Sequence, residues 1–146
     1  MRVIFAVVAL VLVSCSDSET LKVRQFHLRD TEVSNGNEFI RGEMNKRLHG
    51  AVTLEEREAR KGHYYNISWQ GLSGSQPVTV LFEYRQAATG AENKTLKQVM
   101  APSSEGKVEL RVTGESYQKG GRVLAWRITL LDGKQSVAQK KSYLWD

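Results

Sequence analysis

Histidine is the side chain best suited to acid–base and metal chemistry near neutral pH, and this chain has three histidines. They are His27, His49 and His63, so no two of them stand two or four residues apart. A local metal motif needs such close spacing, and the HExxH pattern of zinc hydrolases is missing as well. We therefore expect no metal site and no cofactor, and the alternative is a metal site assembled from positions far apart in the sequence.

The segment GLSGS (71–75) comes nearest to a nucleophilic serine motif. That motif has a glycine two residues after the serine, in a turn between a strand and a helix. Ser75 occupies the glycine position, and the flanks are not typical of that turn. Adjacent acids, Glu55 and Glu56, lie early in an expected helix, where the helix dipole stabilises negative charge. We therefore expect no catalytic residue and no enzymatic activity, with a small hydrolase as the third alternative.

A basic segment, RGEMNKRLHG (41–50), is the first candidate binding surface. Positive side chains so close together favour an anionic lipid, a glycan or an acidic partner. The alternative is an ordinary solvated loop. The residues that would carry this surface are Arg41, Lys46, Arg47 and His49.

Two tyrosines form the second candidate surface. Tyr64 is out of phase with the core-facing residues of the strand predicted over 63–69, and Tyr117 lies in the glycine-rich turn region 113–121. Exposed tyrosines are enriched where proteins bind partners. We predict that both are exposed anchors for a partner, and the alternative is that they fill the core.

Length and composition bound the size of the fold. The chain has 146 residues, of which 40% are hydrophobic and 25% charged, and these values are typical of one folded domain. The net charge is +5, but the 21 basic residues are interleaved with 16 acidic ones. We therefore expect no nucleic-acid partner.

The first fourteen residues are predicted to be a signal peptide. Residues 3–14 (VIFAVVALVLVS) are almost wholly apolar and follow Arg2. A helix that spans a bilayer needs about 20 apolar residues. The shorter run matches the apolar region of a secretory signal. The alternative is a buried N-terminal strand.

The only cysteine of the chain directly follows this run, in Leu12-Val13-Ser14-Cys15. These four residues resemble the lipobox of bacterial lipoproteins. The resemblance implies cleavage between Ser14 and Cys15 and acylation of Cys15, which would anchor the protein in a lipid bilayer. Stable anchoring needs more than one acyl chain, since each buried methylene contributes about 0.8 kcal/mol. Ser16 rather than Asp follows the cysteine, which implies the outer membrane, facing the periplasm, for a Gram-negative source.

The remaining pattern predicts one short helix among short strands. The helix is expected within 53–62, where Thr53 and Glu56 form a capping box. The segment 39–50 reads only as partly extended. A slip of the alternation near Gln25 predicts a bulge in the first strand. Strands are predicted within 21–29, 63–69, 78–85, 95–100, 107–112, 122–131 and 136–145.

Short strands with turns about every ten residues indicate an all-β fold. The pattern is similar to the immunoglobulin or fibronectin type III class. We therefore predict an immunoglobulin-like antiparallel β-sandwich with one short helix in a connection. It forms a single domain over 21–146, after an acylated tether at 15–20. The segment 122–131 is expected to bury one alternating face, made of Leu124, Trp126, Ile128 and Leu130.

These observations together predict a non-catalytic binding or accessory module of a bacterial cell envelope, held at the membrane by Cys15. Its partner would be an envelope protein or polymer. The second hypothesis is an inhibitor or chaperone-like subunit of an envelope enzyme or assembly. In that case the basic segment 41–50 and the glycine-rich segment 113–121 would be the inserting elements.

Overall fold

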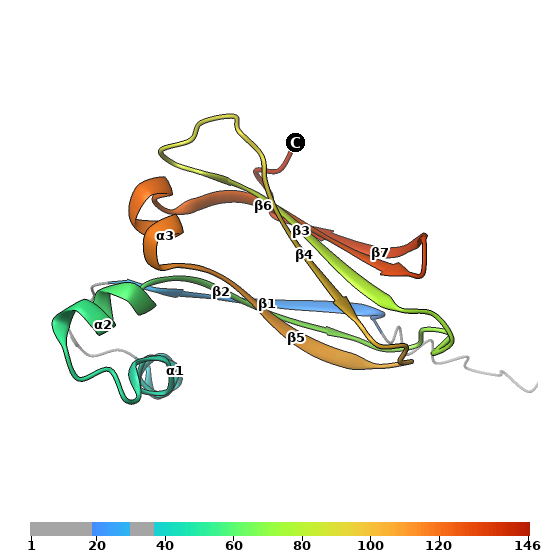
Figure 1. The fold of residues 1–146 in the computed structure, drawn as a ribbon, viewed down its shortest axis with the longest axis horizontal. Coiled ribbons are helices and arrows are strands. Elements are labelled where there is room, and N and C mark those ends of the chain that lie inside the picture. The colour runs from blue at the N-terminus through green and yellow to red at the C-terminus, as the bar shows by residue number, and fades with distance from the viewer. Residues whose placement is uncertain (1–18, 30–36) are drawn as a thin grey trace, which may run out of the picture.

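Alternating apolar side chains bring two antiparallel sheets face to face in the computed structural model (Figure 1). The structure describes residues 19–29 and 37–146, so the predicted signal peptide and Cys15 lie outside the described residues. The strands of the first sheet, in spatial order, are β1 (Leu21–Leu28), β2 (Gly62–Trp69) and β5 (Gly106–Thr113). Those of the second are β4 (Lys94–Met100), β3 (Val78–Gln86), β6 (Val123–Asp132) and β7 (Gln135–Lys141).

The core lies between the two sheets and is rich in aromatic rings. The Tyr65 ring of β2 packs on Phe82 of β3 with 4.5 Å between ring centroids, and Phe82 stacks on Tyr84 at 5.0 Å. The alternation predicted for β2 and β3 is confirmed, since the inward residues of both strands are buried. Those residues are Tyr65, Ile67, Trp69, Val78, Val80, Phe82 and Tyr84.

The predicted all-β fold with two antiparallel sheets is confirmed, but two details of the strands are wrong. β1 pairs with β2 residue for residue, so there is no bulge at Gln25. Register shifts occur instead between β6 and β7, at Leu130 and Leu131, and between β3 and β6, where Arg85 pairs with Ala125 and Gln86 pairs with Val123. Leu124 is the extra residue of this bulge and is 41% exposed, whereas the sequence placed it in the core.

Within the described residues the connections between strands hold three helices, α1 (Glu38–Leu48), α2 (Leu54–Arg60) and α3 (Gly114–Gly120), so the prediction of one short helix is wrong. The capping box of α2 is confirmed, because the Thr53 and Glu56 side chains bond to each other's backbone N–H groups. The prediction that 39–50 is partly extended is wrong. Asn37 caps α1 by accepting the Phe39 N–H at 3.1 Å. The prediction of a turn over 113–121 is wrong too, since α3 forms there.

The helices gather at one end of the sandwich (Figure 1). α3 lies where the two sheets spread apart. α1 and α2 lie beyond the first sheet, and α1 crosses its outer side. Within residues 19–29 and 37–146, no helix has the length and apolar character needed to cross a bilayer.

Candidate functional site

The outer face of the first sheet collects basic side chains that lie far apart in the sequence. In β1 and β5 the residues that alternate with the core-facing ones point to this side. The pairing places Lys22 beside Ser68 and Ser68 beside Lys107. The next row along the strands aligns Arg24, Asn66 and Glu109. We call this surface the basic sheet face, made of Lys22, Arg24, Asn66, Ser68, Lys107, Glu109 and Arg111.

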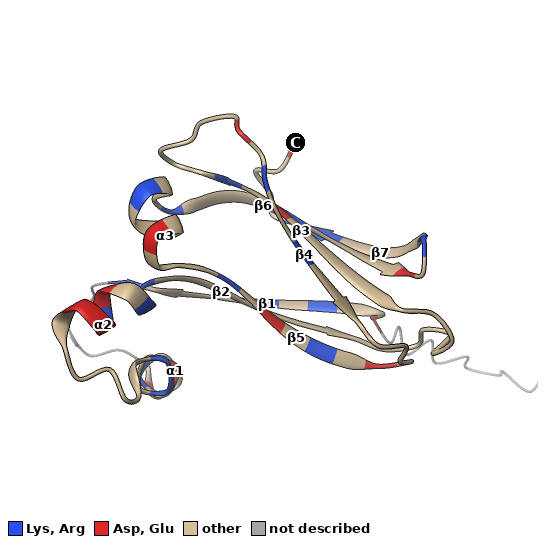
Figure 2. Cartoon of the chain, in the orientation of Figure 1, with Lys and Arg blue, Asp and Glu red and all other residues tan. Residues whose placement is uncertain are grey.

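This face is hollowed rather than flat. A shallow depression of about 630 Å³ lies over the end of the sheet where β1 and β5 begin. Lys22, Arg24 and Lys107 line it together with the amide of Asn66, the hydroxyl of Ser68 and the carboxylate of Glu109. Figure 2 shows the Lys and Arg positions on β1 and β5 in this part of the molecule. Cationic groups and neutral hydrogen-bond donors around one hollow suit an anionic ligand.

The positive charge of the face is not cancelled by its own acids. In the part of the chain that the structure describes, Lys22, Arg24, Lys107 and Arg111 form no salt bridge. All four are exposed. Glu109 is bound by Arg47 of α1. These four cations are therefore free to meet a partner.

Arg47 belongs to the support of this face. Its guanidinium bonds to Glu109, lies 3.4 Å from Glu43, and covers the Tyr64 ring at 4.2 Å from the ring centroid. The side chain is 7% exposed. With its amide nitrogen 3.1 Å from Glu109 Oε2 and its oxygen 3.3 Å from Arg47 Nη2, Asn66 completes this network. Arg47 thus fastens α1 to the sheet.

The prediction that Tyr64 is an exposed anchor is wrong. It is only 3% exposed, because Arg47 lies over its ring. Its hydroxyl donates to the Arg60 carbonyl at 2.5 Å, and burial raises the pKa of that hydroxyl. Arg60 in turn donates to the carbonyls of Arg47 and His49, at 3.0 and 2.5 Å. Tyr64 therefore joins β2 to both helices.

An Arg47→Met variant should lose about 2 kcal/mol of unfolding free energy, because Glu109 keeps its charge without its partner in a half-buried setting. Urea unfolding monitored by circular dichroism measures this change. The matched control is Lys119→Met, since the Lys119–Glu115 pair lies with both side chains about three-quarters exposed. An Arg47→Met loss no greater than that of the control would contradict the role of Arg47.

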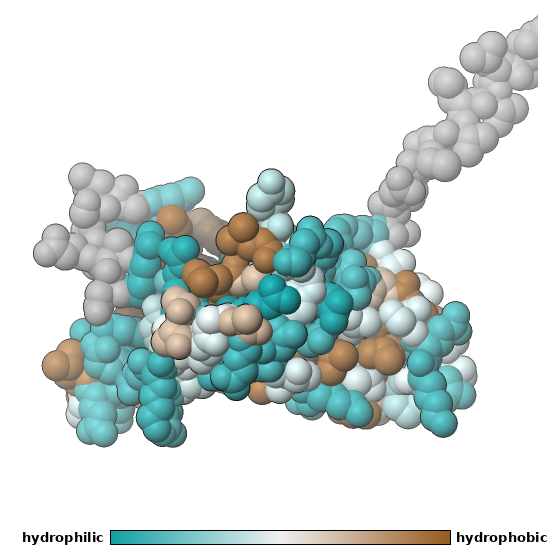
Figure 3. Space-filling view, turned by 90° about the horizontal axis from the view of Figure 1, so that it is seen from above, coloured by the Kyte–Doolittle hydropathy of each residue, from teal (hydrophilic) through white to brown (hydrophobic). Residues whose placement is uncertain are grey.

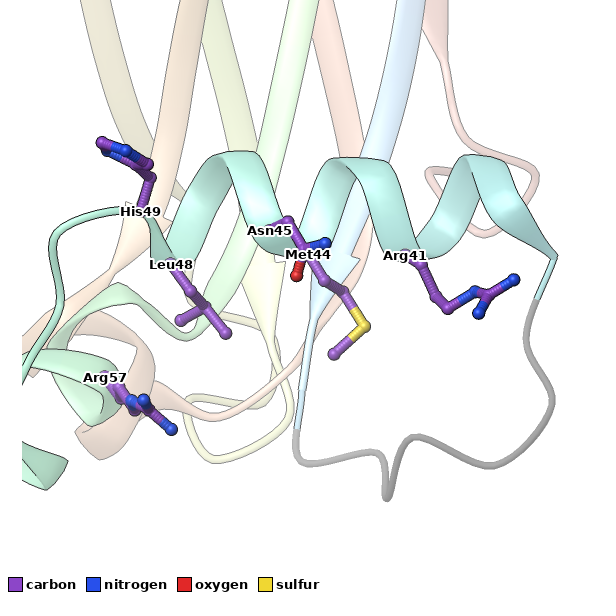
Figure 4. A pocket seen from close by; sticks show the side chains of 6 residues that line it. All are labelled: Arg41, Met44, Asn45, Leu48, His49 and Arg57. Carbon is purple, nitrogen blue, oxygen red and sulfur yellow. The ribbon is translucent and has the colours of Figure 1, made fainter.

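The other members of the predicted basic segment lie on the exposed side of α1 or at its end. Arg41 and His49 line a groove of about 450 Å³ together with Arg57 of α2 (Figure 4). Met44, Asn45 and Leu48 complete its lining. Lys46 is exposed but does not line this groove. The segment is therefore a docked helix in which Arg47 supports the sheet and Arg41 and His49 line a groove, whereas Lys46 does neither.

Two histidines that lie far apart in the sequence are neighbours in the structure. His27 and His63 stack with 3.9 Å between ring centroids, and His27 Nε2 lies 2.8 Å from the Tyr117 hydroxyl. Tyr117 is therefore partly buried on α3, not in a loop. His63 is 2% exposed, and its Nε2 accepts the Val123 N–H at 3.2 Å, which requires that nitrogen to be unprotonated. Burial, then the charges of His27 and Arg122, lower the pKa of His63 to about 3.

His49 does not join this pair, and Ser73 of the GLSGS segment contacts Ser75 and Asp132. Among residues 19–29 and 37–146, no group of three His, Cys, Asp or Glu side chains is arranged to hold a metal ion.

No family model, curated protein or solved structure matches the chain.

The sequence analysis missed the cations of the basic sheet face, although a signal for them was present. Lys22 and Arg24 alternate with Leu21 and Val23 in β1, so they had to point away from the core. The alternation does not say which strand pairs with β5, and in the structure that strand is β2 rather than β4. That pairing puts Lys107 on the same face.

Proposed function

We propose that this chain is a lipid-anchored, non-catalytic binding module of a bacterial cell envelope, and that the basic sheet face is its binding surface. The observation that carries the proposal is the hollow rimmed by Lys22, Arg24 and Lys107, whose side chains form no salt bridge among the described residues. A face built in this way binds anions by charge and hydrogen bonds without needing a reactive group.

The anchor part of the proposal is supported by the sequence. Leu12-Val13-Ser14-Cys15 follows an apolar run of signal-peptide length. Anchoring confines the module to a thin layer at the membrane, so even a modest affinity for a neighbouring component is sufficient. By resemblance to Gram-negative lipoproteins, Ser16 after the cysteine favours the outer membrane, with the module facing the periplasm.

Replacing Cys15 tests the anchor. A Cys15→Ser chain should stay unacylated and uncleaved at this position, because its side chain has no sulfur to receive the lipid. Mass spectrometry of the N-terminal peptide measures both properties, and Ser16→Ala is the matched control, which should mature as the parent does. A Cys15→Ser protein that is still cut before residue 15 and still carries acyl mass would contradict the proposal.

We also propose that the sandwich is of the immunoglobulin type. The first, second and fifth strands form one sheet, and the third, sixth and seventh lie together in the other. This division supports the assignment. The fourth strand pairs with β3, whereas in constant-type immunoglobulin domains it lies beside the fifth.

A further inference from the structure

We propose that the basic sheet face docks on the phosphate groups of anionic phospholipids, in the same membrane that holds the acyl chains of Cys15. This inference rests on the proposed function and names the ligand of its binding surface.

The face begins where the chain comes from the anchor. Five residues separate Cys15 from Leu21, the first residue of β1, and five extended residues reach roughly 17 Å. Lys22 is the second residue of β1. Lys107 lies two strands away in the same row, at roughly 10 Å from the spacing of strands. Two free lysines therefore lie at the end of the sandwich closest to the bilayer.

The charge balance of the face is positive even when its rim is included. Five cations lie on the face or support it, against four acids on it or at its edge, Glu19, Glu43, Glu105 and Glu109. Glu19 is paired with Lys140 and Glu43 with Arg47. Glu109 is bound by Arg47. The cations are Lys22, Arg24, Arg47, Lys107 and Arg111. A lipid phosphate approaching the hollow thus meets ammonium and guanidinium groups before it meets a free carboxylate.

The donors of the hollow match a phosphodiester. Its non-bridging oxygens accept hydrogen bonds and carry one negative charge, which suits Lys22, Arg24 and Lys107. Ser68 lies between the two lysines in the row and carries no charge, so a probe attached there leaves the charges of the face in place. A Lys or Arg close to an anionic bilayer contributes about 1 kcal/mol, which is about a five-fold gain in binding. This attraction acts within the Debye length of about 8 Å, so the face must lie directly on the headgroups.

On the outer face of the second sheet, part of the cationic charge is engaged within the protein, and the exposed Lys97 and Lys134 form no salt bridge among the described residues. Arg127 is bound to Glu83 at 2.6 Å, and Arg85 and Arg127 both lie against the ring of Trp145 from the C-terminal segment. Figure 3, which views the molecule from that side, shows hydrophilic and hydrophobic residues mixed over short distances. The exposed lysines beside its shallow pocket, Lys97 and Lys134, provide a matched control for the face.

The test uses the acylated protein reconstituted into vesicles of phosphatidylcholine, with or without phosphatidylglycerol. A fluorophore is attached through Ser68→Cys or, on the opposite face, through Val99→Cys, because acylated Cys15 has no free thiol and the chain has no other cysteine. A headgroup-linked quencher then reports how close each label lies to the bilayer. We expect phosphatidylglycerol to increase quenching at position 68 several-fold and high salt to reverse it, with no change at position 99.

Charge reversal completes the test. Lys22→Glu with Lys107→Glu should lower the docked-to-undocked ratio at least ~20-fold. Lys97→Glu with Lys134→Glu changes the net charge equally and should leave the ratio unchanged. Circular dichroism melting of each variant shows that the fold is kept.

Three results would overturn the docking: equal quenching at both labels, quenching that ignores phosphatidylglycerol, or an equal effect of the two charge reversals. Quenching that ignores phosphatidylglycerol would direct the face to an acidic envelope protein or polymer instead. The mass of the N-terminal peptide is read from the same preparation. A missing acyl mass would contradict the anchor, whereas lipid-dependent quenching at position 68 would still support the docking.

Discussion

A Gly62→Ala variant should lose about 4 kcal/mol of unfolding free energy. Gly62 is the first residue of β2 and has φ of 141°, a conformation that residues with a side chain rarely adopt. A Cβ built there would lie 2.1 Å from the Val112 carbonyl oxygen of β5. That oxygen belongs to the backbone of a paired strand, so it moves only if the pairing of β2 with β5 is disturbed. Urea unfolding monitored by tryptophan fluorescence measures the loss.

Gly50 offers the control for this substitution. It also follows a helix, α1, and has φ of 79°, but a Cβ there meets nothing within 4 Å. Gly50→Ala should therefore lose only about 1 kcal/mol, the cost of the left-handed backbone alone. Equal losses for the two variants would show that the close approach of β2 and β5 at Gly62 does not constrain the fold.

Acidification from pH 6.5 to 4 should lower the unfolding free energy by about 3 kcal/mol through His63 alone. In the folded protein the pKa of His63 is lowered to about 3, first by burial and then by the charges of His27 and Arg122. In the unfolded chain a histidine has a pKa of about 6.5. Between these two pKa values the unfolded chain binds one proton more than the folded protein. The unfolding free energy therefore falls by about 1.4 kcal/mol for each pH unit of acidification. The full contribution of neutral His63 is present above pH 6.5.

His27, which stacks on His63, acts in the same direction. The pKa of His27 is lowered as well, by burial and by the charges of Arg29 and Arg122. The Tyr117 hydroxyl bonds to His27. A His63→Gln variant keeps an acceptor for the Val123 N–H but has no titrating ring. Unfolding curves at several pH values should thus be less pH-dependent for the variant than for the parent between pH 6.5 and 4, and identical slopes would refute the buried neutral state of His63.

The two-sheet fold could be predicted from the sequence because the strongest signals in the sequence are local. Alternation in β3 placed Val80 and Phe82 in the core, and the Thr53–Glu56 capping box located the start of α2. Both signals arise from neighbours in the chain, so no partner strand was needed to interpret them. Leu124 shows the limit of this approach, since its exposure depends on a bulge set by the pairing with β3.

The site was harder to predict because it depends on contacts between distant segments. Arg47 looked like one cation among several, but Glu109 and Tyr64 from two different strands make it a buried support. α1 escaped prediction because none of its apolar residues is buried, so they form no clear helical stripe, and Phe39 is 68% exposed. The cations of the basic sheet face were visible in the alternation, but their convergence follows from the order β1-β2-β5.

The central claim is that the basic sheet face is the working surface of an anchored module. A photo-crosslinking residue at Ser68, compared with one at Val99 on the opposite sheet, tests it directly in the intact host envelope. We predict that position 68 gives one abundant adduct, and that Lys22→Glu with Lys107→Glu removes it while position 99 gives none. Adducts of equal yield at both positions, or an adduct at position 68 that survives the charge reversal, would contradict the claim.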